Sequence, residues 1–193
     1  VVRPAPFDPS RTPTAECTEG EYHPLTPSRL LDTRSTPVPA GWPGGKPIGT
    51  MEQLRLPIRG ANGVIPNSAD VTGVMVNITA ANNAPGSQPT FLSVTPSATP
   101  PGAEPATSVT NVAAGQVKAN MAIVPVGADG SVHIFNSLGA TNVIVDVLGY
   151  LERGADASTR TGRVIPLDAP FRAFDTRQAA FANTPLGFGT KEE

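Results

Sequence analysis

Hydrophobic and polar residues alternate along several short runs of this chain. In the run 51–58, Leu54, Leu56 and Ile58 fall on one side of an extended strand, with polar residues between them. Successive side chains of a β-strand point to opposite faces, so this alternation predicts a strand with one buried face. The same pattern predicts further strands at 70–80, 90–95, 116–126, 131–137 and 142–151.

Glycine-containing turn signals separate these runs. Asp129-Gly130 and Leu138-Gly139 precede the last two predicted strands, and glycine takes the positive φ that tight hairpin turns require. We therefore predict a three-stranded antiparallel meander over 116–151. Several short strands joined by such turns predict an all-β fold, an antiparallel β-sandwich of jelly-roll or immunoglobulin-like type with long proline- and glycine-rich loops.

The composition agrees with this fold class and excludes several others. The 193 residues include 22 prolines and 19 glycines. Each interior proline costs a helix about 3 kcal/mol and each glycine about 1, which excludes helical bundles, coiled coils and doubly wound α/β folds. A hydrophobic content of 39% and a net charge of −2 indicate a chain that can bury a core.

The charge and the hydrophobic pattern also limit the possible binding partners. Fourteen basic against 16 acidic residues provide no basic footprint for nucleic acid, and no apolar run is long enough to span a bilayer. The single cysteine, Cys17, cannot form an internal disulfide and is interpreted as a spare thiol. The chain begins Val1-Val2-Arg3 without a methionine, which favours a processed or excised piece of a longer protein.

Proline spacing and a repeat divide the chain into four parts. Residues 1–20 are predicted to be an extended, proline-rich arm or linker, because four prolines there block both helix and central strand. Residues 21–152 form one β-sandwich unit, and 153–165 a linker. Residues 166–193 begin a second, incomplete unit, since Asp32-Thr33-Arg34 returns as Asp175-Thr176-Arg177.

Three motifs carry a resemblance to a known family. They are Arg-Leu-Leu-Asp-Thr-Arg at 29–34, Val-Met-Val-Asn-Ile-Thr at 74–79 and Val-Ile-Val-Asp-Val-Leu-Gly-Tyr at 143–150. Together they resemble a repeat domain of actinobacterial secreted and cell-surface proteins, which occurs in tandem or attached to exported enzymes. Related segments are also expected in structural proteins of actinobacterial phages. The resemblance implies a non-catalytic β module without a cofactor.

Arg29, Asp32 and Arg34 form the densest charged cluster. Arginine presents a rigid fork that suits carboxylates, so the cluster predicts a structural clamp that fixes the first strand to the sandwich. The alternative is a pair of arginines that grip an anionic ligand such as a wall polymer. Asp146 interrupts an apolar strand, and it either pairs with Arg29 or Arg34 or lies exposed on the outer face.

Other polar and aromatic residues give weaker signals. Trp42, in a proline- and glycine-rich loop, and Tyr22 are candidate contacts for a sugar or a protein partner, or simply packing residues. His23 and His133 lack ligands at metal-binding spacing, so no zinc site is predicted. Four asparagines that punctuate the predicted strands are interpreted as hydrogen-bonded connectors: Asn77, Asn111, Asn120 and Asn136.

The second unit contains four of the seven phenylalanines: Phe171, Phe174, Phe181 and Phe188. We predict that this tail (residues 166–193) packs against the body of the chain or a neighbouring chain, by strand addition to an exposed edge. The chain is then a non-catalytic structural or interaction module of a cell surface or other extracellular assembly, and its partners are proteins or further copies of itself. Two alternatives are a decoration protein of a phage capsid or tail, located in the virion, and a cell-wall carbohydrate-binding module of an exported enzyme. No nucleophile, base and stabiliser meet at a recognisable spacing, so no enzymatic activity is predicted.

Overall fold

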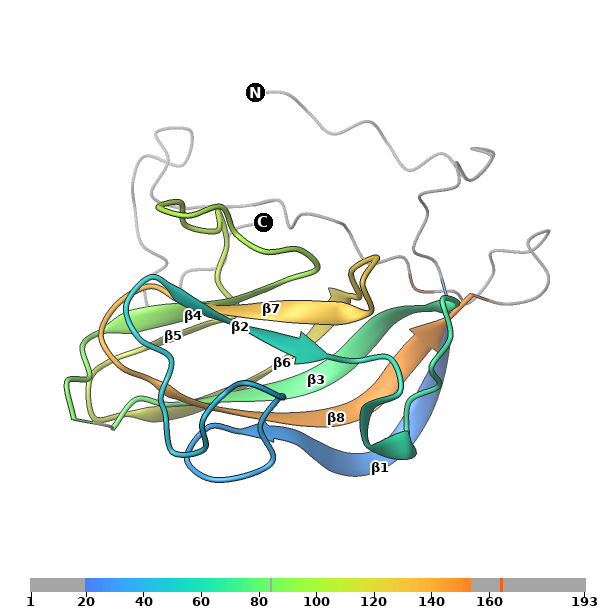
Figure 1. Ribbon diagram of the computed structural model, residues 1–193, viewed down its shortest axis with the longest axis horizontal. Coiled ribbons are helices and arrows are strands. Elements are labelled where there is room, and N and C mark those ends of the chain that lie inside the picture. The colour runs from blue at the N-terminus through green and yellow to red at the C-terminus, as the bar shows by residue number, and fades with distance from the viewer. Residues whose placement is uncertain (1–19, 84, 154–163, 165–193) are drawn as a thin grey trace, which may run out of the picture.

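The computed structural model describes residues 20–83, 85–153 and 164. Its strands form two antiparallel four-stranded sheets that pack face to face (Figure 1). The strands are β1 (Glu21–Asp32), β2 (Glu52–Pro57), β3 (Val71–Ala81), β4 (Thr90–Thr95), β5 (Thr110–Val112), β6 (Val117–Pro125), β7 (Ser131–Asn136) and β8 (Asn142–Glu152), and one short 3-10 helix covers Ala61–Gly63. The predicted all-β antiparallel sandwich is confirmed.

The chain changes sheet at almost every connection. The first sheet has the strand order β1-β8-β3-β6, and the second has the order β2-β7-β4-β5. Only β4 and β5 are both consecutive and paired. Hence β1 and β6 are the edge strands of the first sheet, while the first and last strands of the domain lie side by side.

The predicted meander over 116–151 is wrong. β6 pairs with β3, β7 pairs with β2 and β4, and β8 pairs with β1 and β3. Directly after β6, Val126 donates its N–H to the carbonyl of Thr72 and stays with the first sheet. Gly130 accepts the N–H group of Ile58 and starts β7 in the second sheet. The turn between them therefore crosses from one sheet to the other.

The core lies between the two sheets and follows the alternation in the sequence. Leu54 and Leu56 of β2 and Val74, Val76 and Ile78 of β3 are each at most 3% exposed and belong to one apolar cluster. Burying a side chain of this size stabilises the fold by about 1.5–3 kcal/mol. The polar residues between them point away from the core, so one buried face per strand specifies the sandwich.

β1 tolerates prolines because it is an edge strand. Pro24 and Pro27 lack an N–H group, but a strand at the edge needs hydrogen bonds on one side only. Its register with β8 is irregular between Pro24 and Ser28 and regular again at Ser28 and Arg29. A second irregularity, between Arg29 and Leu31, places Asp32 opposite Ile144, while Arg29 lies opposite Asp146.

A long loop between β4 and β5 covers the outer face of the second sheet. Phe135, on that face, is only 2% exposed and lies 6.3 Å from the ring of Phe91, measured between ring centroids. Gln53 fastens the loop, because its side-chain amide donates to the carbonyl of Thr99 and accepts the N–H group of Thr99, both at 2.9 Å. In the described part of the chain, no helix is long and apolar enough to cross a membrane.

Candidate functional site

Arg29 and Asp146 form an ion pair between β1 and β8. The two residues are opposite each other in the strand register. Arg29 donates from Nε to Oδ1 of Asp146 at 2.8 Å and from Nη2 to Oδ2 at 3.1 Å. Such a bidentate pair fixes direction as well as distance. Asp146 thus lies on the outer face of the first sheet, between the buried Val145 and Val147, and has a partner there.

Asp32, at the end of β1, lies between Arg34 and Arg29. Its side chain is only 6% exposed. Arg34 donates to it from the backbone N–H at 3.1 Å, from Nε at 2.9 Å and from Nη2 at 2.7 Å. Nη1 of Arg29 lies 3.5 Å from its Oδ2. These contacts, and the side-chain bond to Arg34 above all, hold the pKa of Asp32 below its ordinary value of 3.8.

The arrangement of these four residues, here called the clamp, favours a structural role over an anion site. Two guanidinium groups face two carboxylates, so the clamp has no net charge. Each arginine already directs its fork at a carboxylate, and those hydrogen bonds raise the pKa of Arg29 and Arg34. An anionic ligand would have to compete with carboxylates that belong to the fold.

Trp42 is half-buried, and both its indole N–H group and one face of its ring contact Lys46. Its indole Nε1 donates to the carbonyl of Lys46 at 3.0 Å. The ammonium group of the same lysine lies 4.2 Å above the ring, in a cation–π contact. Lys46 therefore occupies one face of the ring, which a sugar would need for stacking.

Tyr22 is 41% exposed but is fixed against β8. Its hydroxyl donates to the carbonyl of Leu148 at 3.1 Å, and its ring lies over Gly149, where a Cβ atom would come within 2.4–2.6 Å of the ring. Tyr22 stands near the start of β1, whereas the loop of Trp42 folds against Ser35, beyond the end of β1. The two aromatic residues do not form one platform.

The two histidines lie in different sheets. His23 stacks on Tyr150 with a centroid distance of 4.9 Å, and its Nε2 lies 3.6 Å from a carboxylate oxygen of Glu152. His133 is on β7, opposite Arg55, and burial lowers its pKa. No three His, Cys, Asp or Glu side chains within the described ranges gather as metal ligands.

Asn136 connects strand ends deep in the structure. Its fully buried amide nitrogen lies within 3.2 Å of four carbonyl oxygens, those of Ile48, Gly49, Leu138 and Gly139. A second buried amide, that of Asn82, donates to the carbonyls of Gln88 and Ala113 and accepts from Thr141. Asn82 was not among the predicted connectors, although its position directly after an apolar strand was a usable signal.

The connector interpretation is wrong for Asn111. Its side chain is exposed and donates only to the hydroxyl of Ser108, three residues earlier, at 2.9 Å. Asn77 lies on the outer face of β3, opposite Asp146. Asn120 does connect the two sheets, because its Nδ2 donates to the carbonyl of Val109, before β5, at 2.6 Å.

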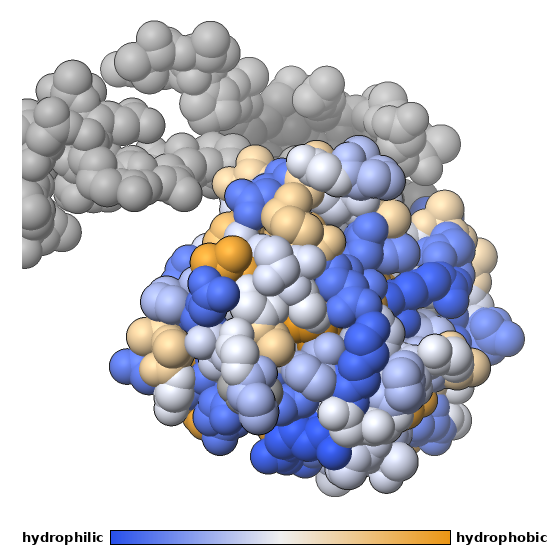
Figure 2. Space-filling model, turned by 60° about the vertical axis from the view of Figure 1, so that its left-hand side comes forward, coloured by the Kyte–Doolittle hydropathy of each residue, from blue (hydrophilic) through white to orange (hydrophobic). Residues whose placement is uncertain are grey.

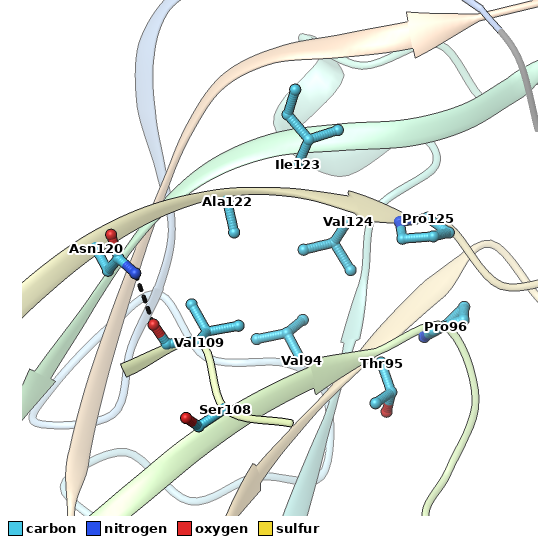
Figure 3. Close-up of a pocket in the computed structure, with 10 residues that line it drawn as sticks. All are labelled: Val94, Thr95, Pro96, Ser108, Val109, Asn120, Ala122, Ile123, Val124 and Pro125. Atoms are coloured by element: carbon cyan, nitrogen blue, oxygen red, sulfur yellow. Dashed lines mark hydrogen bonds between the residues drawn. The ribbon is translucent and has the colours of Figure 1, made fainter. Parts of the chain in front are cut away.

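An apolar groove lies beside β6, between the two sheets (Figure 3). Its volume is about 270 Å³, and it is lined by Val94 and Val109 on one side and by Ala122 and Val124 on the other. The Asn120–Val109 hydrogen bond crosses one end of it. None of its lining residues is titratable, so the groove offers apolar contact and backbone groups rather than acid–base chemistry.

The remaining predicted regions are mostly outside the described residues. These include the arm up to residue 19, the linker apart from Arg153 and Val164, and the tail with Phe171, Phe174, Phe181 and Phe188. On the described part, the face in Figure 2 is mainly hydrophilic, with apolar residues in small separate groups. No family model matches the chain, and no curated protein matches its sequence.

Proposed function

We propose that this chain is a non-catalytic structural and interaction module of an extracellular surface or large assembly. One observation carries the proposal: Arg29, Asp32, Thr33 and Arg34, which make the contacts at the end of β1, return in the sequence as Arg172, Asp175, Thr176 and Arg177. A protein assembled from repeated units needs the same internal fastening in each unit. The clamp supports this interpretation because its charges are paired with one another.

The repeat is longer than the Asp-Thr-Arg triplets. Pro24 matches Pro166 at an offset of 166 − 24 = 142, and Gly20 matches Gly162 at the same offset, 162 − 20 = 142. At Gly20 a Cβ atom would come within 2.8–3.0 Å of the backbone of Glu152, so only glycine fits beside β8. The sequence at 162 thus keeps glycine where a strand equivalent to β1 requires it.

The end of the repeat also keeps a residue type that is buried in the first unit. Thr33 is fully buried, and its hydroxyl accepts the N–H group of Val143 at 2.9 Å and donates to Asn142 at 3.0 Å. Thr176 stands at the matching place, between Asp175 and Arg177. The residues that β1 uses against β8 therefore recur together, which supports a second strand of the same type in the tail.

Two alternatives to this function are a module located on a phage particle and a module that binds a carbohydrate. The same module on a phage particle is a capsid or tail decoration protein, and the clamp and repeat fit either setting. A cell-wall carbohydrate-binding module is supported less, because Lys46 covers one face of Trp42 and the hydroxyl of Tyr22 is already bonded.

The test compares the full chain with a chain that lacks residues 166–193, by light scattering after size exclusion and by thermal melting. We expect the deletion to change the oligomeric state or lower the melting temperature. Equal mass and equal melting of the two chains would reject docking through the tail. In parallel, binding to purified cell wall that is lost in a Trp42→Ala variant would favour the carbohydrate alternative.

A further inference from the structure

β6 exposes one edge of its backbone. The β3–β6 ladder is regular from Gly73–Pro125 to Ala81–Val117. Just beyond its ends, Val126 donates to the carbonyl of Thr72 and Asn82 donates to the carbonyl of Gln116, both at 2.9 Å. Hydrogen-bonded pairs alternate in an antiparallel ladder, so the even-numbered residues of β6 bond to β3. The odd-numbered residues direct their N–H and C=O groups away from β3.

These outward groups are largely without partners. In the parts of the chain that the structure describes, neither N–H nor C=O of Ala119 or Ile123 has a hydrogen bond on this side. The N–H group of Met121 is covered by its neighbour, because Oδ1 of Asn120 accepts it at 3.0 Å. The amide of Asn120 is therefore the one side chain that shields the middle of this edge among the described residues.

The side chains of the same residues form an exposed apolar row. Val117 is 58% exposed, Met121 56% and Ile123 40%, and Ala119 between them is also exposed. They lie beside Met75, Asn77 and Thr79 on the outer face of the first sheet. On the opposite side of β6 is the apolar groove (Figure 3), toward which Ala122 and Val124 point while Ile123 points away. A strand added here would find apolar contacts on both of its faces.

β6 is also complementary to itself. Lys118 is the one charged residue among its nine, so the edge offers little attraction to a charged partner. If two copies of β6 pair antiparallel with Met121 opposite Met121, then Ala119 faces Ile123 and Lys118 faces Val124 of the other copy. The pairing uses the outward backbone groups of the odd-numbered residues, with Asn120 releasing the N–H group of Met121, and places no like charges opposite each other.

We propose that the β6 edge is a self-association surface, on which β6 of a second copy adds antiparallel and joins the two first sheets into one continuous sheet. Long unprotected apolar edges are templates for such pairing. The inference names a partner for the interaction role proposed above and rests on that role.

The experiment measures self-association of the full 193-residue chain by sedimentation velocity from about 1 to 500 μM. The wild type should dimerise, and Met121→Lys should weaken the dimer at least tenfold, because two ammonium groups would then meet at the two-fold axis. Thr79→Lys is the matched control, since it adds the same charge to the same face one strand further in, and it should change association much less. Circular dichroism and melting verify that each variant folds.

Two further variants separate strand addition from simple contact of apolar surfaces. Ala119→Pro removes an outward N–H group but no bond to β3, and it should weaken the dimer. Asn120→Ala uncovers the N–H group of Met121 and should strengthen it. In the wild type, amide hydrogen exchange at Ala119 and Ile123 should slow as the concentration rises.

A wild type that stays monomeric over this range would overturn the inference, and so would equal weakening by Met121→Lys and Thr79→Lys. Association that survives Met121→Lys unchanged but disappears with deletion of the tail would reject the β6 edge and leave the proposed function standing. Association that is weakened by Met121→Lys but unchanged by deletion of the tail would support the β6 edge and reject docking through the tail.

Discussion

The hydroxyl of Thr90 donates a hydrogen bond of 2.8 Å to the side-chain oxygen of Asn136, and both side chains are buried. The same threonine oxygen accepts the N–H group of Leu138 at 2.9 Å. The amide nitrogen of Asn136 is committed to backbone carbonyls. This pair therefore joins β4 to the end of β7 and to the loop that precedes β2.

The Asn136 amide should be the most sensitive polar group of the core. Asn136→Asp replaces the donor with a carboxylate oxygen that would face backbone carbonyls, and we expect it to lower the free energy of unfolding by about 3 kcal/mol or more. Thr90→Val removes the donor to the buried side-chain oxygen of Asn136 and the acceptor of the Leu138 N–H group, and it should cost about 1–3 kcal/mol. Urea unfolding measures both. A loss below about 1 kcal/mol for Asn136→Asp would mean that water reaches this site.

The clamp should make the fold sensitive to acid. Asp32→Ala removes an almost buried carboxylate with three bonds to Arg34, and we expect a loss of about 2 kcal/mol at pH 7. The pKa of Asp32 is lowered in the folded state, so its contribution is present above 3.8 and disappears as the pH falls through the folded-state value. The stability difference between wild type and variant, from melting at pH 7, 4, 3 and 2, should shrink over the last steps.

A surface ion pair provides the control. Arg55 and Asp129 approach to 2.8 Å, but their side chains are 51% and 45% exposed. Arg55→Gln should cost less than about 1 kcal/mol, because water solvates both groups. An Asp32→Ala variant that melts like the wild type would refute the clamp as a structural element.

Gly149 is expected to accept a side chain only if Tyr22 leaves. Gly149→Ala alone should displace the tyrosine ring, break its bond to Leu148 and cost about 1–3 kcal/mol. In a Tyr22→Ala background the same substitution should cost far less, because the ring that it meets is gone. A double-mutant cycle with denaturant unfolding and near-ultraviolet circular dichroism measures this coupling. Additive costs would show that the clash with Tyr22 is not the cause.

Local patterns in the sequence predicted six of the eight strands but not their arrangement. Alternation identified β2 and β3 because each has one apolar face. Prolines disturbed the pattern in β1, and β5, with three residues, is too short to show one. Gly130 correctly marked a turn, but a turn residue does not determine which sheet the next strand enters.

The site residues depend on contacts between distant parts of the chain. Arg29 and Asp146 are separated by 117 positions and Thr90 and Asn136 by 46, so no local spacing could pair them. The sequence indicated a charged cluster at 29–34 and an acidic residue within an apolar strand, which are the two halves of the clamp. The exposure of the apolar face of β6 was not predictable, because alternation does not reveal which face is buried at an edge.

The pairing of β1 with β8 also determines how the domain would respond to force. Glu21, at the start of β1, lies opposite Glu152, at the end of β8, so the chain enters and leaves the domain at the same corner. A force that pulls Glu21 and Glu152 apart would act across the β1–β8 ladder and break its hydrogen bonds one after another. It would not load them all at once in shear. The contact of Tyr22 with Leu148 would be met early along this seam, and the bidentate contact of Arg29 with Asp146 after it.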